Sequence, residues 1–165
     1  MHVLQFLPTR YPLCAVMLLA ILAVVSSPNT TTFADAPVLI TKASKFSASE
    51  TLDRLTDALE SKSITIFVRV DHTIGAKKAG MDLPPTELLI FGNPKLGTPL
   101  MTANRSIAID LPMKALAWTD ADGKTWLSYT DPAVLKARWS IADRDEIFAK
   151  MAGALDKLTN GATGN

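Results

Sequence analysis

The chain has 165 residues, 48% of them hydrophobic and 20% charged, and its formal net charge is +1. This length fits a single domain, and the composition excludes intrinsic disorder, which needs fewer apolar residues and a larger net charge. Because basic residues are not in excess, a nucleic-acid partner is disfavoured.

The N-terminal segment has the pattern of a secretory signal peptide. Arg10 is the only charged side chain in the first 34 residues, histidine apart, and residues 13–25 are nearly all Leu, Ala, Val, Ile or Met. A helix that spans a bilayer needs about 20 apolar residues, whereas the apolar part of a signal peptide needs about 7–15. We therefore predict a leader over residues 1–34, cleaved after Ala34, and a periplasmic or secreted domain over residues 35–165. The alternative is an uncleaved N-terminal anchor.

The only cysteine, Cys14, lies at the start of that apolar run, whereas a lipoprotein cysteine follows the run. The domain left after cleavage has no thiol. This excludes a Cys nucleophile, a Cys-ligated zinc or iron–sulfur site and a c-type haem. Loss of Arg10 with the leader also leaves 16 basic residues against 16 acidic ones, so the domain carries no net charge.

The first predicted elements are a strand at 38–41 and a helix. Ser47 and Glu50 form a capping box, which predicts the start of that helix. Its apolar face carries leucines at i, i+3 and i+7, namely Leu52, Leu55 and Leu59.

The strongest strand pattern covers residues 64–72. Its alternation predicts one apolar face made of Ile64, Ile66, Val68 and Val70. His72 is then expected to leave the sheet on that apolar side. A short helical piece follows between Gly75 and Gly80, and two prolines end it.

The next predicted elements are a strand at 87–91, buried on both faces, and a turn at 92–95. Thr98 as N-cap and Pro99 at the first helical position predict a short helix through about Asn104. Residues 107–112 form an extended or irregular connector.

The last predicted elements are a hairpin and a helix. Strands at 115–118 and 125–129 surround Gly123, which supplies the positive φ of the turn. A helix begins near residue 143, and the tail 160–165 is expected to fray. Its apolar face carries Ile147, Met151, Ala154, Leu155 and Leu158.

The order is strand, helix, four more strands with short helical insertions, and a final helix. Strands grouped between two substantial helices predict an α+β fold, in which an antiparallel sheet of about five strands is packed on one face by two main helices.

Five motifs together resemble a known family. They are Asp71-His72-Thr73, Leu83-Pro84-Pro85-Thr86, Phe91-Gly92-Asn93-Pro94-Lys95, Asp110-Leu111-Pro112-Met113-Lys114 and Tyr129-Thr130-Asp131-Pro132. From about Phe46 to Leu158 the chain resembles the DUF302 domain family. The resemblance implies an α+β fold similar to the TBP-like architecture and a homodimer, and it implies no settled activity.

His72 is the only histidine after the predicted leader, so it is the candidate catalytic residue for any imidazole chemistry. Beside Asp71 at a strand end, it has the residue type of a general acid or base near neutral pH. The alternative is a structural histidine whose ring nitrogens bond to backbone groups.

The segment from Gly92 to Thr98 resembles a phosphate-binding loop superficially, but it lacks the lysine that follows the second glycine in such loops. Backbone N–H groups at a helix start, with Asn93 and Lys95, would suit a small anion or carboxylate ligand. A tight turn without a ligand is the favoured interpretation.

Asp110 and Lys114 flank a Leu-Pro pair and complete the candidate ligand-binding set together with Tyr129. An ion pair between Asp110 and Lys114 would fix the connector. Tyr129, at a strand end, is more often a packed aromatic side chain with a solvated hydroxyl than a proton donor.

No spacing of metal ligands is present, so no metal site is predicted. Haem held by His72 and a methionine (Met81, Met101 or Met113) stays a weaker alternative, because such methionines usually fill cores.

Three hypotheses follow. The first is a homodimeric small-ligand-binding or accessory module, which touches a membrane only through its leader. The second is a hydrolase or isomerase with His72 as general base and Lys95 as electrostatic stabiliser. The third is a redox accessory protein that binds haem or copper. The sequence leaves the cofactor unknown.

Overall fold

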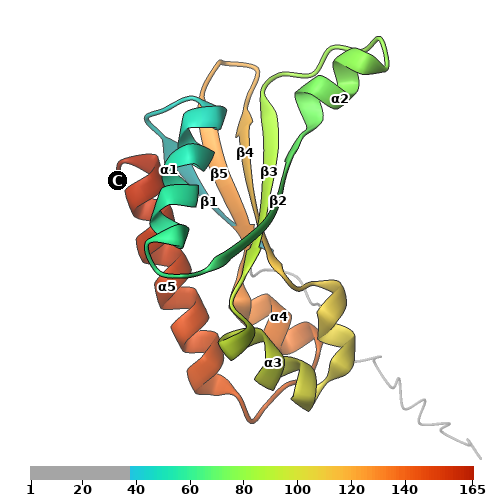
Figure 1. Cartoon of the computed structure of the whole chain (residues 1–165), viewed down its shortest axis with the longest axis vertical. Coiled ribbons are helices and arrows are strands. Elements are labelled where there is room, and N and C mark those ends of the chain that lie inside the picture. Colours follow the sequence, from blue (N-terminus) through green and yellow to red (C-terminus); the bar gives the residue numbers. More distant parts are fainter. Residues whose placement is uncertain (1–37) are drawn as a thin grey trace, which may run out of the picture. The chain divides into compact units, whose positions relative to one another are not determined.

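The computed structural model describes residues 38–165, and the predicted leader lies outside them. The elements in chain order are β1 (Leu39–Ser44), α1 (Ala48–Glu60), β2 (Thr65–Asp71), α2 (His72–Lys78), β3 (Thr86–Gly92), α3 (Pro94–Ala103), the 3-10 helix η1 (Arg105–Ile109), β4 (Met113–Thr119), β5 (Thr125–Thr130), α4 (Pro132–Arg138) and α5 (Asp145–Thr163) (Figure 1).

The five strands form one sheet in the order β1-β5-β4-β3-β2, and every neighbouring pair is antiparallel. The two long helices, α1 and α5, pack against each other on one side of this sheet (Figure 1). The predicted α+β class, with about five antiparallel strands and two main helices, is confirmed.

The capping signal predicted the start of α1 correctly. The side-chain oxygen of Ser47 accepts the backbone N–H of Glu50 at 3.2 Å, which satisfies one of the unpaired donors of the first turn. The helix then buries Leu52, Leu55 and Leu59 completely. Each such leucine contributes about 1.5–3 kcal/mol through its removal from water.

The two faces of the sheet follow from the strand register, since directly opposed residues of antiparallel strands lie on the same face. The covered face, under α1 and α5, includes the row Arg69, Leu89, Ala115, Tyr129 and Ile40. The open face includes the neighbouring row Val70, Leu88, Leu116, Ser128 and Thr41. No described helix is placed over the middle of the open face (Figure 1).

One prediction about β2 is wrong. The strand contains a β-bulge between Ile66 and Val68, so that Ile66 pairs with Phe91 and Val68 pairs with Ile90. An extra residue shifts the alternation by one position. Ile66 therefore lies on the covered face and Val68 on the open face, where the unbroken alternation had placed them together.

The predicted start of α3 is also wrong. The helix begins at Pro94 with Asn93 as its N-cap, and Pro99 lies inside it. The side-chain oxygen of Asn93 accepts the N–H of Lys95 at 2.9 Å. Each of the pairs Asn93-Pro94 and Thr98-Pro99 has an N-cap residue followed by a proline at the first helical position. The helix begins at the earlier pair.

The C-terminal region is more ordered than expected. The tail was predicted to fray from residue 160, but α5 continues to Thr163, whose carbonyl accepts the N–H of Lys45 at 3.1 Å. The side-chain amide of Asn165 donates to the carbonyl of Ala43 at 2.9 Å. These are contacts with residues far away in sequence, so the local composition gave no signal of them. The short helix α4 was not predicted.

Candidate ligand-binding cavity

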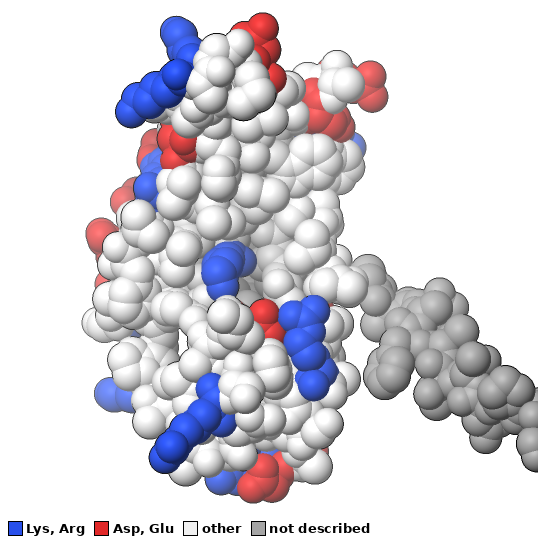
Figure 2. Space-filling model, turned by 90° about the vertical axis from the view of Figure 1, so that its right-hand side faces the viewer, with Lys and Arg blue, Asp and Glu red and all other residues white. Residues whose placement is uncertain are grey.

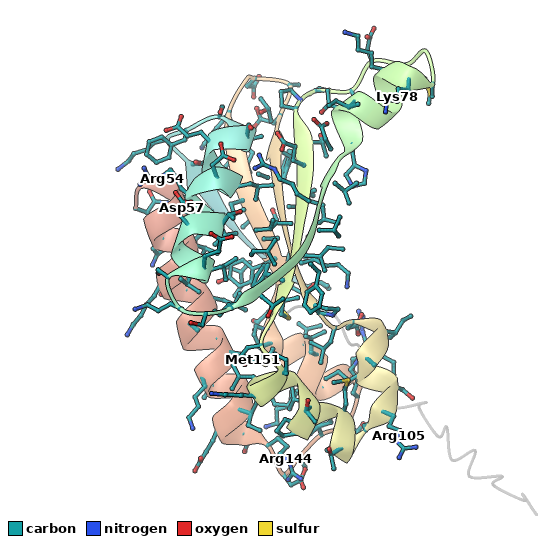
Figure 3. The ribbon with its side chains drawn as sticks, viewed as in Figure 1. Arg54, Asp57, Lys78, Arg105, Arg144 and Met151 are labelled. Atoms are coloured by element: carbon teal, nitrogen blue, oxygen red, sulfur yellow. The ribbon has the colours of Figure 1, made fainter. Side chains whose placement is uncertain are left out.

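An apolar cavity of about 220 Å³ lies between α3, α5 and the adjoining ends of β2, β3 and β4. In Figure 3, Met151 of α5 marks the place where that helix passes α3. The lining is mostly aliphatic, aromatic and thioether side chains: Ile64, Phe67, Phe91, Leu96, Met101, Leu111, Met113, Met151, Leu155 and Leu158, with smaller contributions from Gly92, Asn93, Pro94, Gly97, Thr98, Pro112 and Ala154.

Small residues shape this cavity. A Cβ atom at Gly92 would lie 3.2 Å from Pro112 Cβ and 3.4 Å from the Phe67 ring. A side chain at this position would therefore crowd its neighbours, and the missing Cβ lets the end of β3 approach the connector before β4 closely. Ala154 on α5 contributes only a methyl group to the wall, which leaves the space in front of it empty.

The polar groups of the cavity gather at the start of α3. Asn93 and Thr98 both line it. Lys95, in the first turn of the same helix, is exposed, and within residues 38–165 it forms no ion pair. The site therefore combines an apolar interior with the amide of Asn93 and the hydroxyl of Thr98, and Lys95 belongs to the same helical turn but not to the lining.

Four of the six residues predicted for a site lie near this cavity. Asn93 lines it and Lys95 stands beside it. Asp110 and Lys114 flank Leu111 and Pro112, which both line it, and Lys114 Nζ donates to the carbonyl oxygen of Asp110 at 3.3 Å.

The expected ion pair between Asp110 and Lys114 is not formed. The Asp110 carboxylate instead accepts Trp139 Nε1–H at 2.7 Å and pairs with Arg138 at 3.1 Å. Both partners lie at the end of α4, an element that the sequence had not revealed. Lys114 donates to the carbonyls of Asp110 and Pro112 instead, each at 3.3 Å. Asp110 thus ties the connector to α4.

His72 lies at the other end of the sheet. It is exposed at the start of α2, whose N-cap is Asp71. Asp71 pairs with Glu87 near the start of β3, whereas Asn93 follows the end of β3, about 20 Å further along the strand. Figure 3 shows the same separation, because Lys78 of α2 lies near the top of the view and Met151, which lines the cavity, lies in its lower half. The structure does not bring His72 and Lys95 to one site.

Tyr129 belongs to the core. Its side chain is 2% exposed on the covered face, in the row that contains Leu89 and Ala115. Burial raises the pKa of its hydroxyl, which therefore stays protonated at neutral pH. Tyr129 stabilises the packing of the sheet against α5 and does not line the cavity.

The methionines proposed for haem are divided between the two ends. Met101 and Met113 line the cavity, whereas Met81 follows α2, in the same segment as His72. Across residues 38–165 no three His, Cys, Asp or Glu side chains are grouped as they would be around a metal ion.

The sequence did not predict the cavity itself. Its walls come from four separate stretches of the chain, 64–67, 91–101, 111–113 and 151–158, and each apolar residue has an ordinary place in the pattern of its own strand or helix. The one available signal was the excess of thioether side chains, since Met101, Met113 and Met151 all line it and methionine adapts to irregular spaces.

No helix within the described residues is long and apolar enough to cross a membrane. The fold and the cavity together define a class: an α+β domain with an antiparallel sheet, open on one face, and an apolar cavity between its helices and the strand ends. The family model of a domain of unknown function, DUF302, matches residues 40–158, so the chain belongs to the DUF302 family.

A solved structure has the same fold. The crystal structure of an uncharacterized conserved DUF302 protein from Bacillus stearothermophilus superposes with a TM-score of 0.70 at 20% sequence identity. The match covers 77% of this chain and 99% of that one.

Curated proteins that match this chain are named as channels and not as DUF302 proteins. The chain is 45% identical over 128 residues to proteins named fluoride-specific ion channel FluC 1 from Brucella suis and from Brucella abortus. The match covers 77% of this chain but only 50% and 47% of those proteins. The chain thus spans about half the length of the curated relatives it matches.

Proposed function

We propose that this chain binds a small amphipathic ligand, with an apolar body in the cavity and an anionic head beside the first turn of α3. The observation that supports the proposal is a cavity of about 220 Å³ whose lining is nearly all apolar. Pockets of this kind, with a few polar groups on one side, are typical of small-molecule sites.

The volume limits the ligand. An apolar protein cavity of about 150 Å³ holds benzene, so by proportion 220 Å³ holds about nine non-hydrogen atoms. A six- to eight-carbon acyl chain or a substituted benzene ring has this size. For so few atoms we expect a dissociation constant on the order of 0.1–1 mM.

The anionic head is inferred from the charge beside the cavity. Lys95 carries the nearby positive charge, and Asn93 and Thr98 offer hydrogen-bonding groups at the same end. A carboxylate there would meet an ammonium group exposed to solvent. Such an exposed pair adds about 0.2–1 kcal/mol, so the apolar body supplies most of the affinity.

Titration of the chain with octanoate and with toluene, followed by calorimetry, tests the proposal. Ala154→Leu fills the space in front of α5, and we expect it to weaken the binding of both probes more than tenfold. The matched control is Ala149→Leu, which introduces the same side chain at an exposed position of the same helix outside the lining. Equal binding by Ala154→Leu and wild type would contradict the site.

The head group has its own test. Lys95→Gln removes the charge, and we expect it to weaken octanoate binding about two- to fivefold and to leave toluene binding unchanged. If toluene binds and octanoate does not, the cavity is a binding site but the anionic head is wrong.

The hydrolase hypothesis receives less support. It needs His72 and Lys95 around one reacting atom, and these residues lie at opposite ends of β3. A binding role needs no such juxtaposition, so it is the function that the geometry favours.

An accessory role beside a membrane protein is a second candidate. The chain matches about half of relatives named fluoride channels, and none of its described helices could span a bilayer. On this proposal the shared domain assists a channel that the remaining part of those relatives forms. Vesicles containing this chain should then release no fluoride above the rate of empty vesicles, as measured with a fluoride electrode. Fluoride release would contradict an accessory role.

Export remains part of the proposal. N-terminal sequencing of the natively expressed protein should give Asp35 as the first residue, and a chain that starts at Met1 would contradict cleavage after Ala34.

A further inference from the structure

The open face of the sheet carries almost no charge. Three rows of side chains cross it, and Lys114 is the only charged residue among them. The rows are Val68, Ile90 and Lys114, then Val70, Leu88, Leu116, Ser128 and Thr41, and then Thr86, Trp118, Trp126 and Ala43. Figure 2 looks onto this side of the molecule and shows a broad area with few charged side chains between the top and the bottom.

Exposed large apolar side chains stand on all four sides of this face. They are Leu39 in the edge strand β1, Val68 in the edge strand β2, Ile74, Met81 and Leu83 in the segment 72–85, and Ile109 in η1 at the opposite end of the strands. The segment 72–85, called the arm here, contains α2, which buries none of its own residues. The arm and η1 lie on the side of the molecule away from α1 and α5 (Figure 1). Exposed apolar surface gathered in this way marks an interaction site for a protein or a membrane.

Two tryptophans stand side by side near the hairpin end of the face. Trp118 and Trp126 are directly opposed on β4 and β5, and their ring centroids lie 6.3 Å apart. Each indole N–H already donates within the domain, that of Trp118 to Ser128 Oγ at 3.1 Å and that of Trp126 to Asp120 Oδ2 at 2.7 Å. The rings are therefore held in place, and they stay partly exposed. Indole rings favour the boundary between lipid headgroups and acyl chains, where an apolar and a polar environment meet.

The charged residues are divided between the two sides of the sheet. The helices on the covered side are acidic, since α1 and α5 together carry seven carboxylates and three basic side chains. Five basic side chains of the segments that form or flank the open face are exposed and, within residues 38–165, form no ion pair: Lys77, Lys78, Arg105, Lys114 and Lys124. Only two exposed carboxylates, Asp82 and Asp122, belong to the same segments. The open side therefore complements a negatively charged partner.

We infer that the open face docks onto the surface of an anionic lipid bilayer. The apolar side chains around the face enter the boundary between the headgroups and the acyl chains, the two indole rings lie at the level of the headgroups, and the lysines and Arg105 reach the phosphates. The acidic helices α1 and α5 face away from the bilayer. The sequence predicts membrane contact through the leader alone, whereas this face gives the domain a membrane contact of its own. No ligand in the cavity is needed for it.

The face combines the two attractions that hold a peripheral protein on a bilayer. An apolar anchor alone binds weakly and reversibly, and a group of basic residues is a common second signal. Near an anionic surface each lysine or arginine strengthens binding about fivefold. A protein partner would bury Lys114 near the centre of the interface, where lysine is depleted. Nucleic acid would make no use of exposed aliphatic groups such as Ile109.

Co-sedimentation of the natively expressed chain with lipid vesicles tests the inference. One set of vesicles contains phosphatidylcholine alone, and the other contains about 30 mol% phosphatidylglycerol, which supplies the negative charge. We expect binding to the anionic vesicles to be at least about tenfold tighter, and we expect added salt to weaken it. A wild-type chain that stays in the supernatant with anionic vesicles would overturn the inference, whether that chain is a monomer or a dimer.

Paired lysine substitutions test the charge. Lys77→Gln together with Lys78→Gln removes two cations from the arm, and we expect this to weaken binding to anionic vesicles about 10- to 30-fold. The matched control is Lys150→Gln together with Lys157→Gln, which removes two exposed lysines without an ion pair from α5. Because those lysines lie on the far side of the sheet, salt screens them, and we expect a change of less than about twofold. Equal losses would overturn the docking of the open face.

Ile109→Ser tests the apolar contact. Ile109 is 76% exposed, so its removal should leave the free domain folded, as circular dichroism would establish. We expect the variant to bind anionic vesicles about 3- to 10-fold more weakly than wild type, because it loses apolar surface that the bilayer would cover. A folded variant that binds as tightly as wild type would contradict insertion at this end of the face.

A fluorescent label tests which side of the domain meets the lipid. In a Cys14→Ser background, an environment-sensitive dye on Leu39→Cys or Ile109→Cys should shift its emission to shorter wavelengths when anionic vesicles are added, because both positions belong to the open side. The same dye on Ala149→Cys, at an exposed position of α5, should keep its emission in water. A shift at position 149 as large as the shift at position 109 would overturn the arrangement.

Discussion

The two faces of one sheet are built from alternate residues of the same strands, and yet they differ sharply. On the covered face Leu89, Ala115 and Tyr129 are at most 2% exposed beneath α1 and α5. On the open face their neighbours Leu88 and Leu116 keep part of their surface in water.

The difference shows that apolar pattern and burial are separate properties. Both faces have an apolar composition, but within residues 38–165 the helices α1 and α5 cover only one of them. The covered face is the core that determines the fold. The open face carries no helix of residues 38–165, and the cavity lies at one end of the covered face, between α3 and α5.

Truncation of adjacent leucines of β3 gives the largest expected contrast. Leu89→Ala should lower the free energy of unfolding by about 2–5 kcal/mol, because it leaves a cavity in the core. Leu88→Ala should lower the free energy of unfolding of the monomer by less than about 1 kcal/mol. Urea denaturation at a concentration where the wild type is monomeric measures both. Equal losses would show that the open face is buried in the monomer.

Removal of the charge network on the covered face should have a smaller effect. Arg69 Nη2 lies 2.7 Å from Glu87 Oε2 and donates to the carbonyl of Ser49 at 3.0 Å. Arg69→Met leaves the Glu87 carboxylate, whose side chain is only 12% exposed, without this partner, at a cost of about 1–3 kcal/mol.

Lys114→Met on the open face is the matched control for Arg69→Met, since Lys114 is exposed and donates only to backbone carbonyls. We expect it to change the free energy of unfolding by less than about 0.5 kcal/mol. Equal losses in the free energy of unfolding for the two substitutions would contradict the stabilising role assigned to Arg69.

The smallest expected effect is a pH response at the hairpin end of the open face. The Asp120 carboxylate accepts Trp126 Nε1–H at 2.7 Å, and this hydrogen bond holds the pKa of Asp120 below its usual value. Because the folded pKa is depressed, the stabilisation is complete above the unfolded pKa and is lost as the pH falls through the folded pKa. Trp126 fluorescence should therefore titrate with a midpoint below the pKa of an ordinary aspartate, and Asp120→Asn should abolish this transition.

Much of the fold could be predicted because it depends on local signals. Ser47 caps α1, alternation marks the strands, and Gly123, with φ of 79°, makes the hairpin turn. The bulge in β2 could not be predicted, since one inserted residue leaves no mark in composition. The buried end of α5 is fixed by contacts of Thr163 and Asn165 with distant residues.

The candidate site was predicted only in part. Asn93, Lys95, Asp110 and Lys114 share one end of the sheet because the end of β3 adjoins the start of its antiparallel neighbour β4, where Phe91 pairs with Met113. His72 was grouped with them because these polar residues lie at predicted strand ends and turns. In an antiparallel sheet, however, successive strands end at opposite edges, so the ends of β2 and β3 are about a strand length apart.

The most direct test of the cavity uses methionine methyl groups. In a chain labelled with methyl-¹³C methionine, titration with octanoate should shift the resonances of Met101, Met113 and Met151 along one saturable curve, because all three line the cavity. Met81, which follows α2 at the other end of the sheet, should not shift and serves as the internal control. If the three cavity resonances stay fixed up to 10 times the expected dissociation constant, about 1–10 mM, the cavity does not bind such ligands.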